Sequence, residues 1–194
     1  IERIVSNCSL NITWRPGVDF ITTETEVNRL VWITSLRPEE EGTTKRILED
    51  LVPMMENKGI HVDLFEPATA NALLEYISML TLHAKRGLRP IIHLDLHGSQ
   101  KAGFVIVKSN EILSWTKLVE KLRLLNQATR NNLLTVSFAC FSLDLLSEIE
   151  FQGPSPFSCL IAPNEEVKAG FIEDNTKNFY EMLFQTSNIN LSFQ

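Results

Sequence analysis

Short apolar runs alternate along this chain with segments whose apolar residues recur at helical spacing. The apolar runs predict strands at residues 29–36, 60–65, 90–97, 133–139 and 157–162, with a shorter strand at 103–107. The helical spacing predicts helices at residues 45–58, 69–85, 114–128 and 143–149, and a last helix that starts at Asp174 or Asn175. Strands and helices that alternate in this way form a mostly parallel sheet covered by helices on both faces. We therefore expect an α/β fold with a central sheet of about six strands.

Hydroxyl side chains stand at the start of two of the predicted helices. Thr43 or Thr44 and Ser114 are placed where a side-chain oxygen can accept a hydrogen bond from the first helical turn. The acidic run at 39–41 comes just before the first of these helices, and we interpret it as solvated surface.

The first 28 residues follow the alternation least clearly. We interpret residues 1–28 as an N-terminal β segment or extension. Residues 29–194 then form one domain, which is long enough to bury a substantial core.

The predicted strand at 90–97 carries the most informative polar residues. Because side chains alternate along a strand, His93, Asp95 and His97 share one face. Such groups are costly to bury unless they are paired or used. The predicted strand at 133–139 ends directly before Cys140. Functional sites of open α/β sheets form at the carboxyl ends of strands, so His97 and Cys140 are a candidate base and nucleophile.

Charge and cysteine content narrow the function classes. The formal net charge of −6 argues against a nucleic-acid-binding surface, and no apolar run approaches the length of a membrane span. Three cysteines without a Cys-x-x-Cys spacing argue against a disulfide framework and favour a reducing, cytoplasmic compartment. We interpret Cys159 as a core residue and His93 as a buried histidine of the core or one that supports the site.

These motifs make the chain similar to the caspase-like cysteine peptidases, the group of caspases, metacaspases and separase. The similarity is closest to the bacterial caspase-like or CHAT-type domains. It is carried by two apolar strands, one ending in His97-Gly98 and the other in Ala139-Cys140. Supporting segments lie at residues 113–118, 160–167 and 179–183. The resemblance implies a caspase-like peptidase domain over residues 29–194.

The resemblance also implies a mechanism and partners. His97 and Cys140 would be the catalytic pair, and the backbone N–H groups of Gly98 and Cys140 would form the oxyanion hole. Phe138 and Asp95 are the candidate substrate-binding residues. Phe138 stands where a caspase carries glutamine, which argues against a strict aspartate requirement and leaves a basic or an apolar P1 residue. The substrate would be a protein or peptide, with no cofactor, and a regulatory sensor domain or activating partner would suit a role in bacterial defence or cell death.

Two other interpretations remain open at this point. A metal-dependent hydrolase could use His93, Asp95 and His97, since two histidines and a carboxylate suit zinc or iron. For such a metal site the sequence offers no obvious fourth ligand, and Cys140 would have no role. The third interpretation is an inactive peptidase-like domain that serves as a binding module.

Overall fold

The fold is built on a central, mostly parallel sheet, seen in a computed structural model that describes residues 8–14, 21–100, 102–150 and 152–193. Five parallel strands run in the order β4-β3-β5-β8-β9, and two antiparallel strands, β6 and β7, extend the sheet at the carboxyl end of β5. The strands of this sheet are β3 (Arg29–Ser35), β4 (His61–Phe65), β5 (Pro90–Ser99), β6 (Gly103–Ile106), β7 (Glu111–Leu113), β8 (Leu134–Ser137) and β9 (Cys159–Ile161). The predicted α/β class with a mostly parallel sheet is confirmed.

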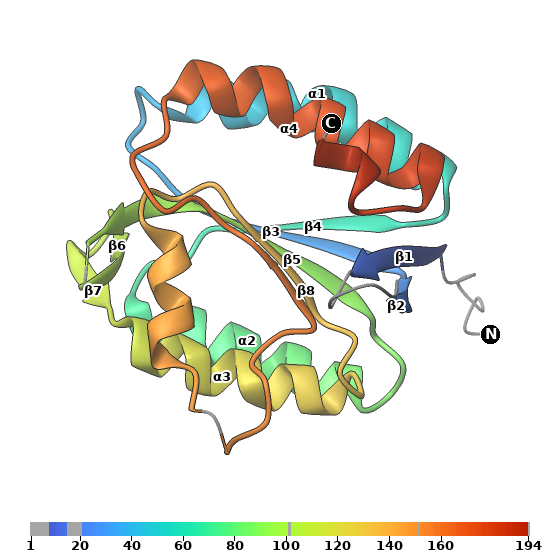
Figure 1. Ribbon diagram of the computed structural model, residues 1–194. Coiled ribbons are helices and arrows are strands. Elements are labelled where there is room, and N and C mark those ends of the chain that lie inside the picture. The colour runs from blue at the N-terminus through green and yellow to red at the C-terminus, as the bar shows by residue number, and fades with distance from the viewer. Residues whose placement is uncertain (1–7, 15–20, 101, 151, 194) are drawn as a thin grey trace.

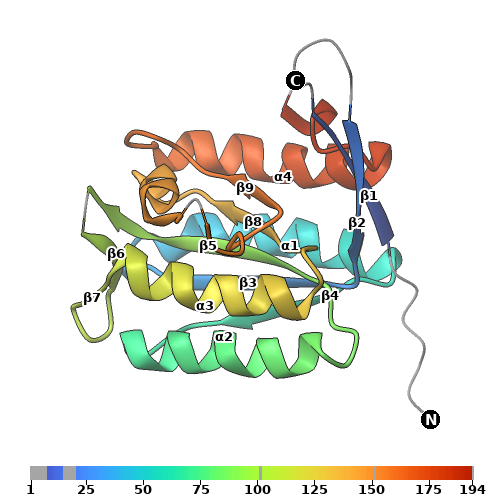
Figure 2. The same ribbon diagram turned by 60° about the horizontal axis from the view of Figure 1, so that its bottom comes forward.

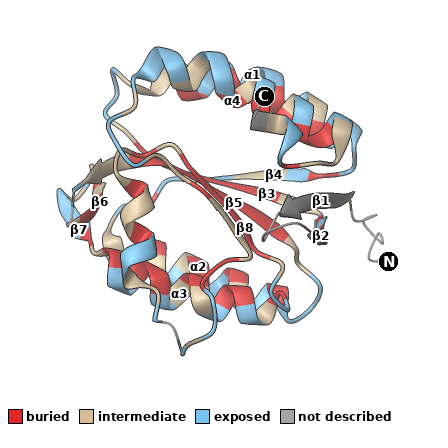
Figure 3. Cartoon of the chain, viewed as in Figure 1, coloured by how far each residue is buried: buried red, intermediate tan, exposed pale blue. Residues whose placement is uncertain are grey.

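Helices cover both faces of this sheet (Figure 1). α1 (Glu41–Asn57) and α4 (Ala169–Thr186) pack on one face. α2 (Ala70–Ala84) and α3 (Trp115–Ala128) pack on the other face. Figure 3 shows β3, β5 and β8 as a buried layer between the two pairs of helices. The apolar periodicity of the helices accounts for this arrangement, because each helix turns its apolar stripe to the sheet.

The described residues also form two short 3₁₀ helices. η1 (Ser142–Glu148) follows the strand that precedes Cys140, and η2 (Leu191–Phe193) follows α4. The α-helix predicted at 143–149 is therefore a 3₁₀ helix. Strand β7 was not predicted, because three residues are too few to show a period.

The first turns of the helices show whether the predicted capping residues are used. The hydroxyl oxygen of Ser114 accepts a hydrogen bond from the Lys117 N–H, so this cap is confirmed. Thr69, predicted as the first residue of its helix, is instead the capping residue of α2, and its hydroxyl accepts from the Ala72 N–H. The prediction of Thr43 or Thr44 as a cap is wrong, because α1 begins at Glu41 and Glu40 takes the capping position without a side-chain bond.

The last helix starts earlier than predicted. α4 begins at Ala169, five residues before the first predicted start at Asp174. No side chain caps its first turn, so the sequence lacks the signal by which the true start could have been recognised.

A hairpin of β1 (Cys8–Trp14) and β2 (Ile21–Val27) lies within the segment predicted as an N-terminal β extension. Residues 1–7 and 15–20 of that segment lie outside the described residues. The backbone of Glu26 exchanges two hydrogen bonds with the side chain of Asn132, at 2.8 and 2.7 Å. Figure 2 shows the hairpin at the opposite end of the sheet from β6 and β7. Among the described residues, none of the helices has the length and apolar character that crossing a bilayer requires.

Candidate functional site

His97 lies where strand β5 changes its partner. Leu96 is the last residue of β5 aligned with β3, and His97 is the first aligned with β6, opposite Val105. The Val107 N–H donates to the Ser35 hydroxyl at 2.9 Å, so β6 continues the line of β3. This places His97 at the carboxyl edge of the parallel sheet, as predicted.

Cys140 lies on a turn that follows β8. The next residue, Phe141, has a φ of 58°, in the left-handed region, so the chain turns sharply there. The Phe141 N–H donates to the carbonyl of Glu165 at 3.3 Å, and the Leu143 N–H donates to the carbonyl of Pro163 at 2.9 Å. The turn is therefore fastened to the segment that leads from β9 to α4.

The ends of β5 and β8 meet at Gly98 and Cys140. Leu94 is aligned with Ser137, so His97 and Cys140 each lie three residues beyond the last aligned pair of the two strands. A Cβ on residue 98 would lie 1.8 Å from the Cys140 carbonyl oxygen, a distance at which no side chain can exist. The structure thus brings the His97-Gly98 and Ala139-Cys140 segments together, and the glycine is required for their approach.

The sulfur of Cys140 faces the segment before α4. The Val167 N–H donates to Cys140 Sγ at 3.4 Å. Cys140 is partly exposed. The Cys140 side chain is therefore in part open to solvent, and its sulfur accepts one backbone hydrogen bond.

His97 makes a close contact with an acidic residue that the sequence analysis did not assign to the site. Its Nε2 lies 2.7 Å from Glu40 Oε2, and the two side chains are 37% and 34% exposed. The expectation that the whole 39–41 run is solvated surface is therefore wrong for Glu40. One signal could have found it, because Glu40 follows the carboxyl end of β3, at the same edge of the sheet as His97.

The charge of Glu40 is stabilised in this position. Partial burial of the carboxylate raises its pKa, but the Arg37 N–H and His97 lower it by more, and the net pKa is below the ordinary value. The Arg37 N–H donates to Glu40 Oε2 at 3.0 Å. Glu40 is therefore an anion at neutral pH.

His93 is a buried histidine of the core, as interpreted from the sequence. It is fully buried, its ring stacks on Trp32 with centroids 3.6 Å apart, and its Nδ1 lies 2.8 Å from the Tyr180 hydroxyl. Burial lowers the pKa of His93 to about 3. This histidine is neutral at physiological pH and does not reach the surface.

Asp95 lies beneath the site, with 8% of its surface exposed. Its Oδ2 accepts hydrogen bonds from Thr44 Oγ1 at 2.5 Å, Trp32 Nε1 at 3.3 Å and Thr34 Oγ1 at 3.5 Å. Desolvation raises its pKa, and the three donors oppose this in part. The carboxylate thus ties the first turn of α1 to strands β3 and β5, and no direct bond joins it to His97.

Phe138 is partly buried beside His93, with ring centroids 5.3 Å apart. Its N–H donates to the Leu94 carbonyl at 3.3 Å, which continues the contact between β8 and β5 by one residue. The side chain joins the core under α1 and α4, two residues before Cys140.

Burial raises the pKa of the other two cysteine thiols. Burial raises the pKa of Cys159 to about 11. Burial also raises the pKa of Cys8, against a smaller opposing effect of Lys58. Within the part of the chain that the structure describes, no group of three or more His, Cys, Asp and Glu side chains is arranged to hold a metal ion.

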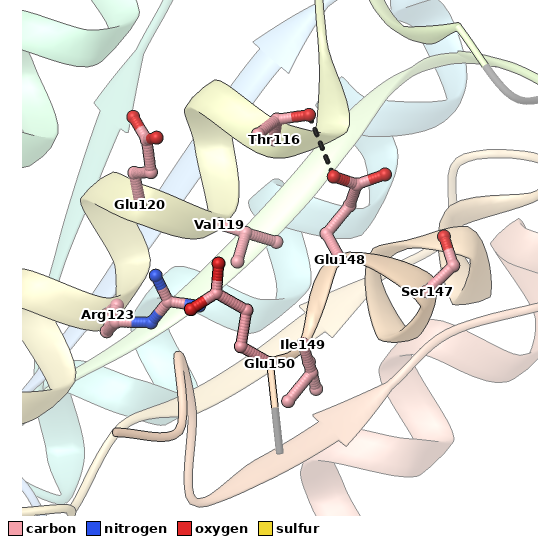
Figure 4. Close-up of a pocket in the computed structure, with 8 residues that line it drawn as sticks. All are labelled: Thr116, Val119, Glu120, Arg123, Ser147, Glu148, Ile149 and Glu150. Carbon is pink, nitrogen blue, oxygen red and sulfur yellow. Dashed lines mark hydrogen bonds between the residues drawn. The ribbon is translucent and has the colours of Figure 1, made fainter. Parts of the chain in front are cut away.

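An open hollow lies elsewhere on the molecule, between α3 and the end of η1 (Figure 4). The Thr116 hydroxyl donates to the Glu148 carboxylate across it at 2.8 Å. Neither His97 nor Cys140 lines this hollow. The hollow and the pair at the carboxyl edge are therefore separate features.

Comparisons with known proteins leave the geometry to be interpreted on its own. No protein-family model, no curated protein and no solved structure matches this chain.

Proposed function

We propose that this protein is a cysteine endopeptidase in which His97 and Cys140 form the catalytic pair. The observation that carries the proposal is the backbone contact between Gly98 and Cys140 at the carboxyl edge of the sheet. A nucleophile and a base delivered by neighbouring strands to one edge are what acyl transfer requires. The resemblance of both segments to caspase-like peptidases supports the same interpretation.

In the proposed reaction, His97 takes the proton from Cys140 Sγ. The thiolate attacks the scissile carbonyl carbon and forms a tetrahedral adduct. His97 then gives the proton to the leaving amine as the C–N bond breaks, which leaves an acyl-enzyme. Water, deprotonated by His97, hydrolyses the thioester and restores the thiol.

The oxyanion of the tetrahedral adduct needs preorganised donors. The N–H groups of Gly98 and Cys140 are the candidates, and the Cys140 N–H makes no hydrogen bond to another described residue. Donors of this kind contribute about 3–4 kcal/mol each to stabilising the transition state in other enzymes. Glycine at residue 98 lets the two segments that carry these donors lie against each other.

The proposed substrate is a protein or peptide. We retain Asp95 and Phe138 as residues that shape the primary specificity pocket, because both lie beneath the pair on the face that carries His97. A regulatory sensor domain or activating partner, a role in bacterial defence and a cytoplasmic location remain part of the proposal. The free state of Cys8, Cys140 and Cys159 supports the location.

The decisive experiment combines a peptide library with an electrophilic peptide. The wild-type protein should cleave members of the library, and Cys140→Ala should cleave none. Mass spectrometry should place the electrophile on Cys140 alone. Turnover that a chelator abolishes and zinc restores would replace this proposal with a metallohydrolase. A protein that binds library peptides without cleaving them or reacting with the electrophile would be a binding module.

A further inference from the structure

The closest polar contact of His97 is with Glu40, from the loop between β3 and α1. The 2.7 Å separation of Glu40 Oε2 and His97 Nε2 is that of a charge-assisted hydrogen bond. An imidazole that donates from Nε2 to a carboxylate is held in the tautomer whose Nδ1 carries a lone pair. His97 Nδ1 has no hydrogen-bond partner among the described residues.

Glu40 is itself held in place from two sides. The Arg37 N–H donates to the same oxygen that contacts His97. Glu40 also directly precedes α1, whose first turn is tied to the sheet by the bond between Thr44 and Asp95. The carboxylate is therefore preorganised by the fold.

Glu40 is distinguished from its neighbours in the acidic run. Glu41 pairs with Lys45 at 2.9 Å, one turn along α1, and Glu39 is exposed. Of the three glutamates, Glu40 is the one that reaches the carboxyl edge of β5. Glu40 Oε2 contacts both the Arg37 N–H and His97 Nε2, so this side chain does more than extend into solvent.

We propose that Glu40 is a positioning residue that holds His97 through Nε2 and so leaves Nδ1 to exchange the proton with Cys140. This inference rests on the proposed peptidase activity. It adds a third residue, from the loop after β3, to a pair that comes from β5 and the turn after β8. A base oriented by a third group is the arrangement that nucleophilic catalysis requires.

The tautomer of His97 tests the inference without any substrate. In a ¹H–¹⁵N long-range correlation spectrum above the titration range of histidine, wild-type His97 should show a protonated Nε2 and an unprotonated Nδ1. Glu40→Ala should give a mixture of both tautomers, whereas Glu40→Gln, which still offers an acceptor oxygen, should keep most of the Nε2–H form. Glu39→Gln, a neighbouring acid with an exposed side chain, is the matched control and should leave the spectrum unchanged. A wild-type Nδ1–H tautomer, or no change in Glu40→Ala, would overturn the inference.

Kinetics test the consequence for the site. Glu40→Ala should lower kcat at least about tenfold with KM nearly unchanged, and Glu40→Gln should recover part of the loss. Equal kcat in Glu40→Ala and wild type would overturn the role of Glu40 while leaving the peptidase proposal intact.

If the wild type cleaves no library peptide, the peptidase proposal fails and the alkylation of Cys140 replaces turnover as the readout. Slower alkylation in Glu40→Ala than in Glu39→Gln would still support the positioning of His97 by Glu40. Equal alkylation rates would overturn it.

Discussion

The backbone of Gly98 lies against that of Cys140, so that a Cβ on residue 98 would come within 1.8 Å of the Cys140 carbonyl oxygen. The atom that would be displaced belongs to the main chain, so no side-chain rotation can relieve the overlap. The two segments that carry the proposed pair can adopt their present separation only with glycine at residue 98.

Gly98→Ala should therefore damage both stability and activity. We expect the free energy of unfolding to fall by about 1–3 kcal/mol, as in other overpacked sites, and peptide cleavage to fall at least about 100-fold as the two segments move apart. Gly170→Ala is the control, because a Cβ there meets nothing within 4 Å and the residue lies in the first turn of α4. That variant should keep wild-type activity and gain up to about 1 kcal/mol. Urea unfolding and a peptide assay measure both, and an active, stable Gly98→Ala protein would refute the packing argument.

Cys140 should be the most reactive of the three thiols. Iodoacetamide should label it first, because burial raises the pKa of Cys159 to about 11 and also raises that of Cys8. Cys140→Ala should abolish cleavage with little loss of stability, and Cys8→Ala and Cys159→Ala should retain turnover.

The choice of His97 over His93 is tested in the same assay. His97→Ala should abolish cleavage and slow the alkylation of Cys140 near neutral pH, with the difference shrinking above pH 8.5 or so, where a free thiol ionises unaided. If His97→Ala stayed active and His93→Ala lost activity through chemistry alone, with its fold intact, the base would have been assigned to the wrong histidine.

His93 should make the fold sensitive to mild acid. Its pKa is lowered by burial to about 3 in the folded protein, against 6.5 for an ordinary histidine, so below pH 6.5 the unfolded chain takes up a proton that the folded chain does not. The stability that the neutral ring allows is complete above pH 6.5 and is lost progressively as the pH falls toward 3. The loss should approach 1 kcal/mol or so between pH 7 and pH 5.5, at roughly 1.4 kcal/mol per pH unit once the unfolded histidine is protonated.

Urea unfolding between pH 7 and pH 5.5 measures this loss, in a range where ordinary carboxylates hardly titrate. The matched variant is the double substitution His93→Phe with Tyr180→Phe, which removes the titrating ring together with the hydroxyl that pairs with it. Its stability should change less over the same range. An equal change in both proteins would assign the acid sensitivity to another group.

Thr44 should stabilise the start of α1 through Asp95. Thr44→Val keeps the shape of the side chain but removes the hydroxyl that donates to Asp95 Oδ2 at 2.5 Å. We expect a loss of about 1–3 kcal/mol, since a hydrogen bond to a buried carboxylate is removed. Thr81→Val is a suitable control, because the Thr81 hydroxyl donates to the carbonyl of Ile77 in its own helix, α2. Thermal unfolding compares the two variants, and equal small losses would show that Asp95 does not depend on Thr44.

The P1 preference of the proposed peptidase should not be a strict requirement for aspartate. Phe138 occupies the position two residues before Cys140, and Asp95 beneath the site would repel an acidic side chain. A library should therefore show a basic or an apolar P1 residue. Cleavage only after aspartate would contradict the assignment of Phe138 and Asp95 to the pocket.

Local signals were enough to predict most of the fold. The apolar runs identified the five parallel strands that the described residues form, and the cap predicted at Ser114 acts within its own first turn. The cap predicted at Thr43 or Thr44 was wrong for a different reason. The Thr44 hydroxyl donates to Asp95, a residue 51 positions away, and no local sequence pattern predicts a partner at that separation.

The candidate site, too, was predicted where the signal is local and missed where the contact is long-range. His97 and Cys140 could be proposed from the sequence because a strong apolar run precedes each of them, and the alternation on β5 correctly placed His93, Asp95 and His97 on one face. Glu40 was missed because an acidic run such as 39–41 is typical of solvated surface. Its contact with His97 depends on the path of the loop after β3. Sequence patterns report the strands well, whereas contacts made by loops depend on the assembled fold.

The change of partners along β5 divides the proposed pair into a fixed and an adjustable member. The β3 side of the strand keeps a neighbour along its length, first β3 and then β6, so His97 belongs to a continuous ladder. On the other side, β8 is aligned with β5 only as far as Leu94. Beyond that residue, the turn that carries Cys140 is the neighbour of β5. Amide hydrogens around Val105 should exchange with deuterium slowly, and those of residues 139–142 faster. In the proposed peptidase we therefore expect Cys140, rather than His97, to be the member of the pair that shifts when a substrate binds.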